Sequence, residues 1–588
     1  MGGYVERQMP DTLDLAQRAK LAFNAMLNVA DDDCGGIPFF SGFLQSDEEN
    51  PAWMSHGNWD YGSSHGRLVD TIALVRSMTG TSEGEEVEER YRRNLLSFIH
   101  ENGLAYRRNS FTEEEIARLD APFRPGASMI DQRAVILGLG TWYSTTDDED
   151  IKGFADRHMA ALKRIARKER ESWYYPASEY LEDGWPSLDA VNTRLAYDPC
   201  AMWGRQVGPI LTYHKLAGNA DALELCENFV ANITQRSGAF LPDGSWNGAL
   251  EYRNGHFHTR MGTLLSIARF ARFKNDARLT AWVERCYRWA LEHWCTGFGW
   301  TPGDMLDQCY EHETCTLVDA IGCAITLAKC GYTEYWAVAE RFLRGHLVES
   351  QLTDTSWVHQ LDTKERDIAG YKTFYRVGDR LKGAFAGYAA PNDFVYSGVK
   401  GRGHIMDVQT CCVAAGGRGL FYGWSSIVTE ERGRVSVNLL LNRATPWLDV
   451  ESHLPYEGKV VLTVKQDLPD LVCRTPEWAP YGAIQVNYRH GDESKEETGR
   501  TLPCIDRVFL RLGAVKKGTA VTVTFPMDER ETVETAVDEK YHVKWRGDNV
   551  VGISPGGSYL PLYKNKSVDS PAPIRTMRLY EGNGKFYE

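Results

Sequence analysis

The sequence predicts a mainly α-helical protein in which an (α/α) toroid, or barrel, is followed by a C-terminal antiparallel β-sandwich. Apolar residues recur at helical spacing from about residue 11 to about residue 425. No fixed repeat period runs through that region, which favours a closed ring of helical hairpins over an open solenoid. Beyond residues 430–433 the apolar residues alternate at period two, as they do in the strands of a half-buried sheet.

The helices of the first region follow one another with glycine-rich connections. Leu68, Ile72 and Val75 lie on one helical face, and the segment that starts near residue 207 ends at Gly218, a typical helix C-cap. Further segments with the same spacing span 130–141, 223–233, 264–268, 282–290, 317–328 and 336–343. In such a toroid, polar and aromatic residues near the helix ends are the candidates for a binding site.

The strands of the second region are separated by proline, glycine and aspartate. The alternating runs span 435–441, 459–464, 507–512 and 520–525, and shorter runs at 541–545 and 550–553 suggest further strands. We therefore expect the α/α barrel over residues 1–428 and the β-sandwich over residues 429–566. The last residues, 567–588, are predicted to be a tail that packs back on the body.

Composition excludes several classes of protein. The chain of 588 residues carries a formal charge of -14, which disfavours a nucleic-acid binder because phosphate contacts need clustered lysine and arginine. No stretch reaches the ~18 uninterrupted apolar residues of a membrane span, and the N-terminus has no apolar core of signal-peptide length. We expect a cytoplasmic protein without a membrane partner, and we leave a homodimer open.

Thirteen cysteines, irregularly spaced, fit reduced thiols with a few metal ligands better than a disulfide framework. Glu313-Thr314-Cys315 and the vicinal pair Cys411-Cys412 together offer three thiols and a carboxylate, enough to close one tetrahedral zinc site. The vicinal pair can reach one metal only if the backbone turns sharply, which we expect Gly416 and Gly417 to permit. Two alternatives stay open: unrelated buried cysteines, and a purely structural zinc site.

These motifs resemble those of glycoside hydrolase family 127, the β-L-arabinofuranosidases. The resemblance rests on Glu313-Thr314-Cys315 and on Cys411-Cys412, in the family's order and at a similar separation. Three weaker likenesses accompany them: Thr296-Gly297-Phe298-Gly299, Gly255-His256 and Trp59-Asp60. The resemblance covers nearly the whole chain thinly, and it implies the same order of helical barrel and sandwich.

The resemblance implies that zinc is bound by Glu313, Cys315, Cys411 and Cys412. It further implies that Cys411 is the nucleophile of a retaining double displacement, in which a thiolate replaces the usual carboxylate. A thiolate in this net anionic site keeps some nucleophilicity.

A second carboxylic acid has to protonate the departing oxygen and then activate water. Where the family has a glutamate after a glycine, this chain has Gly303-Asp304, so Asp304 is the first choice, with Asp307 and Glu311 as rivals. The segment between Asp304 and Glu313 is shorter than in the family. The alternative for Asp304 is a structural role in a Pro-Gly-Asp turn.

The residues expected to bind substrate are His256, Arg205, Trp59 and His65. Arg205 stands where the family has a histidine, and a guanidinium suits a carboxylate, so one hypothesis is an acidic sugar. The alternative is a structural Arg–Asp pair within the barrel. His258 is a rival to His256, since it lies two residues further along.

After the paired cysteines the family continues with a proline and an asparagine, whereas this chain has Val413-Ala414-Ala415-Gly416. These departures are typical of a distant member with a different substrate. The resemblance implies an exo-glycosidase that removes a terminal L-arabinofuranose-like or modified sugar, including an acidic one, from plant-type oligosaccharides. Two alternatives stay open: another carbohydrate-active enzyme on the same scaffold (a lyase or an epimerase), and a non-enzymatic glycan-binding protein with structural zinc.

Overall fold

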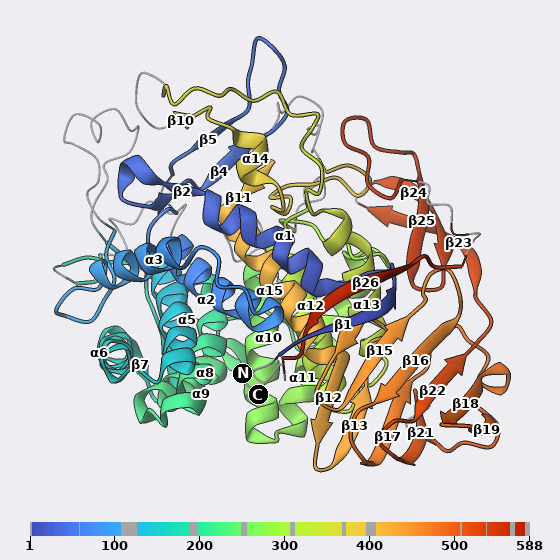
Figure 1. The fold of residues 1–588 in the computed structure, drawn as a ribbon. Coiled ribbons are helices and arrows are strands. Elements are labelled where there is room, and N and C mark those ends of the chain that lie inside the picture. Colours follow the sequence, from blue (N-terminus) through green and yellow to red (C-terminus); the bar gives the residue numbers. More distant parts are fainter. Residues whose placement is uncertain are drawn as a thin grey trace.

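The computed structural model describes most of the chain. The described residues are 3–57, 59–107, 126–182, 184–186, 198–247, 256–305, 312–366, 372–394, 407–505, 508–536, 538–564, 568 and 571–582. Helices make up the first three quarters of the chain, and the strands of the last quarter lie beside them (Figure 1).

Within the described residues, six helices form the inner wall of a barrel. Each contacts the next, and the last contacts the first, which closes the ring. In order they are α2 (Gly62–Thr79), α5 (Met129–Thr146), α8 (Val207–Ala217), α10 (Phe257–Lys274), α12 (Thr314–Lys329) and α15 (Thr410–Ile427). The predicted (α/α) barrel is confirmed.

An outer helix packs on each inner helix. These are α3 (Glu85–Ser97), α6 (Glu149–Ile165), α9 (Ala220–Gln235), α11 (Ala277–His293), α13 (Tyr335–Phe342) and, on α15, α1 (Leu15–Asn28). The outer helices bury one apolar stripe and the inner helices are buried nearly all round, as the two positions require. Because an outer helix returns the chain each time, the inner helices run the same way. Their N-terminal ends therefore gather at one mouth of the barrel.

Short strands cover that mouth. A four-stranded sheet is built in the order β10 (Lys372–Thr373), β5 (Trp53–Ser55), β4 (Ser41–Phe43) and β11 (Val408–Gln409). Small pairs join β2 (Ala30–Asp31) to β3 (Ile37–Pro38), β6 (Ala127–Ser128) to β9 (Glu179–Tyr180), and β7 (Arg167–Glu169) to β8 (Ser172–Tyr174). Runs of two or three residues are too short to show period-two alternation. Strand β11 leads directly into α15 and so anchors its first turn.

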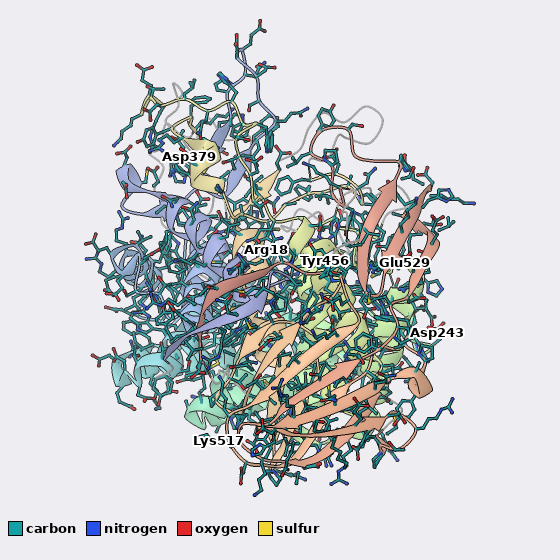
Figure 2. The ribbon with its side chains drawn as sticks, turned by 45° about the vertical axis from the view of Figure 1, so that its right-hand side comes forward. Arg18, Asp243, Asp379, Tyr456, Lys517 and Glu529 are labelled. Atoms are coloured by element: carbon teal, nitrogen blue, oxygen red, sulfur yellow. The ribbon has the colours of Figure 1, made fainter. Side chains whose placement is uncertain are left out.

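The succession of helices ends at Ile427, and two large sheets follow. One has the order β12 (Val428–Glu431), β13 (Arg434–Val437), β17 (Leu468–Arg474), β21 (Phe509–Val515), β20 (Cys504–Ile505). The other has the order β14 (Arg443–Ala444), β15 (Leu448–Ser452), β16 (Lys459–Val464), β22 (Ala520–Thr524), β18 (Gln485–His490), β19 (Glu493–Thr498). Tyr456 and Lys517, labelled in Figure 2, mark opposite ends of the second sheet.

Among the described strands of the sandwich, all pairings are antiparallel except that of β13 with β17, which is parallel and sets Val435 opposite Leu471. A separate three-stranded sheet, β23 (Glu529–Ala536), β24 (Glu539–Arg546) and β25 (Asn549–Ser554), follows in the chain. Near the end, β26 (Ile574–Tyr580) pairs antiparallel with β1 (Tyr4–Pro10). The N-terminal strand thus lies against the β-rich part, where Arg7 Nε donates to Asp449 Oδ2 at 2.8 Å.

Candidate active site at the N-terminal mouth of the barrel

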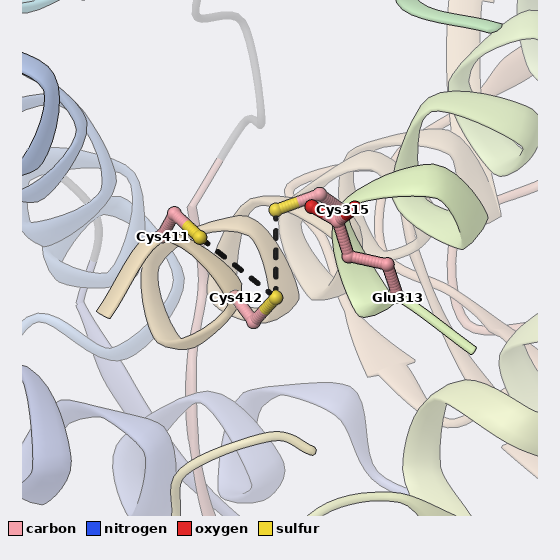
Figure 3. Close-up of side chains that lie close together, drawn as sticks. All are labelled: Glu313, Cys315, Cys411 and Cys412. Carbon is pink, nitrogen blue, oxygen red and sulfur yellow. Dashed lines mark hydrogen bonds between the residues drawn. The ribbon is translucent and has the colours of Figure 1, made fainter. Parts of the chain in front are cut away.

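The first turns of α12 and α15 face each other across the mouth of the barrel. Glu313 is the N-cap residue of α12 and Cys315 lies in its first turn, while Cys411 and Cys412 lie in the first turn of α15. The structure brings these four side chains together, with one ligand atom from each within 4.8 Å of the others (Figure 3). All four residues are buried.

The spacing of the sulfur atoms suits a single metal ion. Cys315 Sγ lies 3.6 Å from Cys412 Sγ, which in turn lies 4.0 Å from Cys411 Sγ. A tetrahedral zinc ion with Zn–S bonds of ~2.3 Å places its sulfur ligands ~3.8 Å apart. Three thiols and a carboxylate at this spacing therefore fit zinc.

The turn that presents the vicinal pair differs from the expectation. The backbone changes from extended at Gln409 to helical at Thr410, and Gly416 and Gly417 lie later, inside α15. These glycines serve packing instead. A Cβ atom on Gly416 would meet the Phe385 ring at 2.1 Å, and one on Gly417 would meet Met26 Cε at 2.3 Å. The expected role in the turn was wrong, because the helix start alone supplies the change of direction.

The electrostatic surroundings favour an ionised thiol at Cys411. Hydrogen bonds with Cys315 and Cys412, together with the nearby Arg67 guanidinium, hold the pKa of Cys411 well below its usual range, although burial opposes this. Burial and the neighbouring thiols raise the pKa of Cys412 well above its usual range. Arg67 Nη1 donates to Cys315 Sγ at 3.6 Å. The N-terminal ends of the inner helices add positive potential at the same place.

His256 contacts both Glu313, the candidate carboxylate ligand, and the predicted acid Asp304. Its Nε2 lies 2.7 Å from Glu313 Oε2. Burial lowers the pKa of His256, but Glu313 outweighs it and the pKa is raised. The backbone of His256 forms an antiparallel bridge with Asp304, which is half-buried. The rivals Asp307 and Glu311, and also Gly255, lie outside the described residues.

Arg205 lies deeper than a typical substrate contact. It is 3% exposed, in the short helix Gly204–Gln206 that leads into α8. Burial lowers the pKa of Arg205, as does Arg67, while Asp319 and Asp198 act in the opposite direction. Asp319 Oδ2 also lies 2.9 Å from His258 Nδ1. The burial of Arg205 favours a structural role, and the Arg–Asp pair itself stays a prediction.

Trp59 and His65 lie in different environments. Trp59 is partly exposed, and the Arg107 guanidinium lies over its ring at 5.1 Å. His65 is fully buried beside the rings of Tyr91 and Phe98, with Nδ1 2.9 Å from the carbonyl oxygen of Asp60. A sugar-binding role remains a prediction for both, and the position of His65 is that of a core residue.

Sequence reasoning missed two features of this mouth. Arg67 stands directly before the apolar residues Leu68 and Val69, and this position gave no signal that could have drawn attention to it. The other feature is a chain of charges in which His56 lies 2.9 Å from both Asp31 and Asp60. Asp31, His56 and Cys34 are also close together, but both ring nitrogens of His56 already face carboxylates.

The fold and the site together define a class of protein: an α/α barrel that carries a β-sandwich and holds a candidate thiolate metal centre at one mouth. No helix in the described ranges is long and apolar enough to cross a membrane. No protein-family model matches the chain, and no curated protein matches it.

Solved structures share this fold. A GH127 β-L-arabinofuranosidase from Geobacillus stearothermophilus T6 is 14% identical, with 92% of this chain and 80% of that one covered and a TM-score of 0.55. A second GH127 β-arabinofuranosidase is also 14% identical, with 93% and 85% covered and a TM-score of 0.56. A structure described as a glycoside hydrolase is 12% identical, with 84% and 77% covered and a TM-score of 0.55. The fold is therefore that of the GH127 enzymes, as the resemblance implied.

Proposed function

We propose that this protein is a retaining glycoside hydrolase whose nucleophile is the Cys411 thiolate. The observation that carries the proposal is the convergence of Glu313, Cys315, Cys411 and Cys412 at the mouth of a barrel with the GH127 fold. A likeness of fold alone leaves the chemistry open, whereas three buried thiols and a carboxylate around one point are a specific chemical device.

The four converging side chains are proposed to hold zinc. When bound, zinc would keep the Cys411 sulfur ionised at neutral pH and hold it in one orientation. His256 would hold the Glu313 carboxylate in place, since its contact with Glu313 Oε2 directs that carboxylate toward the cysteines. Arg67 would offset part of the negative charge that three thiolates and a carboxylate bring together.

The remaining steps belong to residues of this chain. Cys411 Sγ attacks the anomeric carbon, the glycosidic carbon–oxygen bond breaks, and Asp304 gives its proton to the departing oxygen. Asp304 then takes a proton from water, whose oxygen attacks the anomeric carbon and releases the Cys411 thiolate. Two displacements at one carbon leave its configuration retained.

The proposed substrate is a terminal L-arabinofuranose-like or modified sugar of a plant-type oligosaccharide. Whether the sugar is acidic depends on Arg205. Its burial supports a structural role rather than a substrate contact, and therefore a neutral sugar. Hydrolysis of a neutral pentofuranoside should exceed that of its carboxylated analogue by about tenfold or more, because a carboxylate would need an unpaired cation. A preference for the carboxylated analogue would restore the acidic-sugar hypothesis.

Replacement of Cys411 by serine tests the proposal. We expect the Cys411→Ser variant to keep its circular dichroism spectrum and to lose at least ~10³-fold in hydrolysis of aryl pentofuranosides. Zinc content per chain should be measured on the same samples. Cys330→Ser, at the far end of α12, is the matched control and should hydrolyse normally.

The outcomes separate the proposals. Unchanged hydrolysis by Cys411→Ser would exclude the thiolate mechanism. Loss of both zinc and fold would instead identify a structural metal site. In the native protein, a covalent sugar adduct on the peptide that contains Cys411, detected by mass spectrometry after brief exposure to substrate, would identify the nucleophile directly.

A further inference from the structure

The opposite mouth of the barrel, where the inner helices end, contains a cavity of about 360 Å³. Its walls come from the C-terminal halves of α8, α10, α12 and α15. Among the described residues that line it, four are cations, Lys215, Arg269, Arg272 and Lys329, and none is an aspartate or a glutamate. Cations therefore line this C-terminal mouth, whereas thiols and a carboxylate gather at the N-terminal mouth, which we call the thiolate mouth.

The four cations are close enough to influence one another. Burial, Arg272, Arg269 and Lys215 lower the pKa of Lys329 to about 7, although Glu431 opposes them. Burial and the two arginines also lower the pKa of Lys215. Cations in the last turn of a helix are favoured by its dipole, but that effect does not require side chains from three helices to face one cavity.

Arg269 also borders a second cavity, whose lining includes Arg133, Arg418 and the carboxylate of Asp319. Arg269, Thr212 and Tyr422 line both cavities, and the second, of about 40 Å³, penetrates between the inner helices. The Arg269 guanidinium lies 5.0 Å from the centre of the Tyr422 ring, which restricts where it can point. Arg272 Nη2 lies 3.0 Å from Glu431 Oε1, at the outer side of the cluster of cations.

We propose that this cavity is a binding site for a compact phosphate dianion, either inorganic phosphate or the phosphoryl group of a small ester. Two negative charges suit the convergence of four cations, with arginine as a forked donor and lysine as a point charge. The cavity has room for a small phosphate ester. On α12, Lys329 lies 14 residues beyond Cys315, which is about 21 Å along the helix, so the site is separate from the proposed active site.

The test is calorimetric titration of the intact protein with inorganic phosphate at pH 7 and constant ionic strength. We expect saturable binding with one phosphate per chain. Arg269→Gln and Lys329→Gln should each weaken it about tenfold, the usual loss for a charge-assisted hydrogen bond. Lys274→Gln is the matched control, because Lys274 also lies in the last turn of α10 but lines neither cavity and pairs with Glu227.

Chemical modification of single lysines in the native protein tests the same site without any substitution that could prevent folding. At pH 7 an amine-acylating reagent should modify Lys329, and added phosphate should slow that reaction. The rate at which Lys274 reacts should be the same with and without phosphate. Methyl phosphate in place of phosphate tells an ester site from a free-phosphate site. Absence of saturation, equal binding by Arg269→Gln and the native protein, or tighter binding of malonate than of either phosphate would overturn the proposal.

Discussion

At the scale of single residues, the thiolate mouth contains a series of ion pairs in which each charged side chain contacts the next. His56 joins two buried carboxylates, Asp31 and Asp60, and Arg366 also contacts Asp31. Burial alone would lower the pKa of His56, but hydrogen bonds with Asp31 and Asp60 raise it to about 11. The imidazolium therefore fixes the segment that carries Trp59.

This charge makes a prediction about pH. Because the pKa of His56 is higher in the folded than in the unfolded protein, its stabilisation is complete below ~6.5 and is lost as the pH rises toward 11. His56→Gln should therefore lower the free energy of unfolding by about 3 kcal/mol at pH 6 and by much less at pH 10. Urea unfolding at both pH values measures this, with His542→Gln on the exposed face of β24 as control. Equal losses at the two pH values would contradict it.

Residue by residue, the candidate ligands could be predicted from the sequence and their neighbours could not. Glu313, Cys315 and the vicinal cysteines form motifs whose residue types are unusual enough to suggest a metal. Arg67, which contacts Cys315, is one of two arginines in α2, and nothing local tells which element it faces. Arg205 could be placed in the right region, but its burial depends on packing from distant helices.

At the scale of elements, α15 combines the cysteine pair with glycines that allow close packing. Gly416 and Gly417 let the helix approach Phe385, Met26 and Thr71. The position of the cysteines in the mouth therefore depends on residues one turn further along. An added methyl group at Gly416 would push against a buried ring rather than into open space.

A pair of glycine-to-alanine substitutions tests this dependence. Gly416→Ala should destabilise the protein by about 1–3 kcal/mol, because of overpacking, and should reduce zinc content. Gly140→Ala, inside α5 with nothing within 4 Å of its added Cβ, should stabilise it by about 0.5–1 kcal/mol. Thermal unfolding and metal analysis of both variants provide the comparison. If the two variants behave alike, the packing of α15 does not control the site.

The elements show which patterns are visible in a sequence. Long helices and alternating strands produce periods that can be read, so the barrel and the sandwich were predicted correctly. The two- and three-residue strands over the mouth produce no period, and the parallel pairing of β13 with β17 depends on contacts that only the folded sheet creates.

At the scale of the whole molecule, a buried cluster of charges connects the barrel to the sandwich. Glu340 on α13 binds Arg344 at 2.7 Å and also contacts Arg474 of β17, and its Oε2 accepts from the Leu440 amide at 2.9 Å. Burial raises the pKa of Glu340, but the two arginines outweigh it and the pKa is lowered. The cluster ties the two parts into one unit.

Loss of the Glu340 charge should weaken the whole molecule. Glu340→Gln is expected to cost about 3–5 kcal/mol of stability, because two arginines would stay buried without their carboxylate. Denaturant unfolding followed by fluorescence measures the cost, and exposed Glu334→Gln, beside the same helix, should change it by less than about 0.5 kcal/mol. A cost below 1 kcal/mol would show that the arginines find other partners.

Metal removal should also lower the thermal stability of the whole protein. A ligand that binds only the folded state stabilises it, so a chelator should lower the melting temperature by about 5 °C or more and abolish hydrolysis. Added zinc should restore both. The Cys412→Ser variant should melt at the same temperature with and without chelator. If the chelator leaves the melting temperature of the native protein unchanged, that result would argue against a bound metal.

The pairing of β1 with β26 has a mechanical consequence. Tyr4 lies opposite Tyr580, and the Glu581 amide donates to the Gly3 carbonyl at 2.8 Å. The start of β1 and the end of β26 therefore lie side by side at the same end of the two-stranded ribbon. A force that pulls the ends apart would load these hydrogen bonds one after another, as in opening a zipper, rather than all at once in shear. In an optical trap the ribbon should therefore peel at low force, before the sandwich or the barrel gives way.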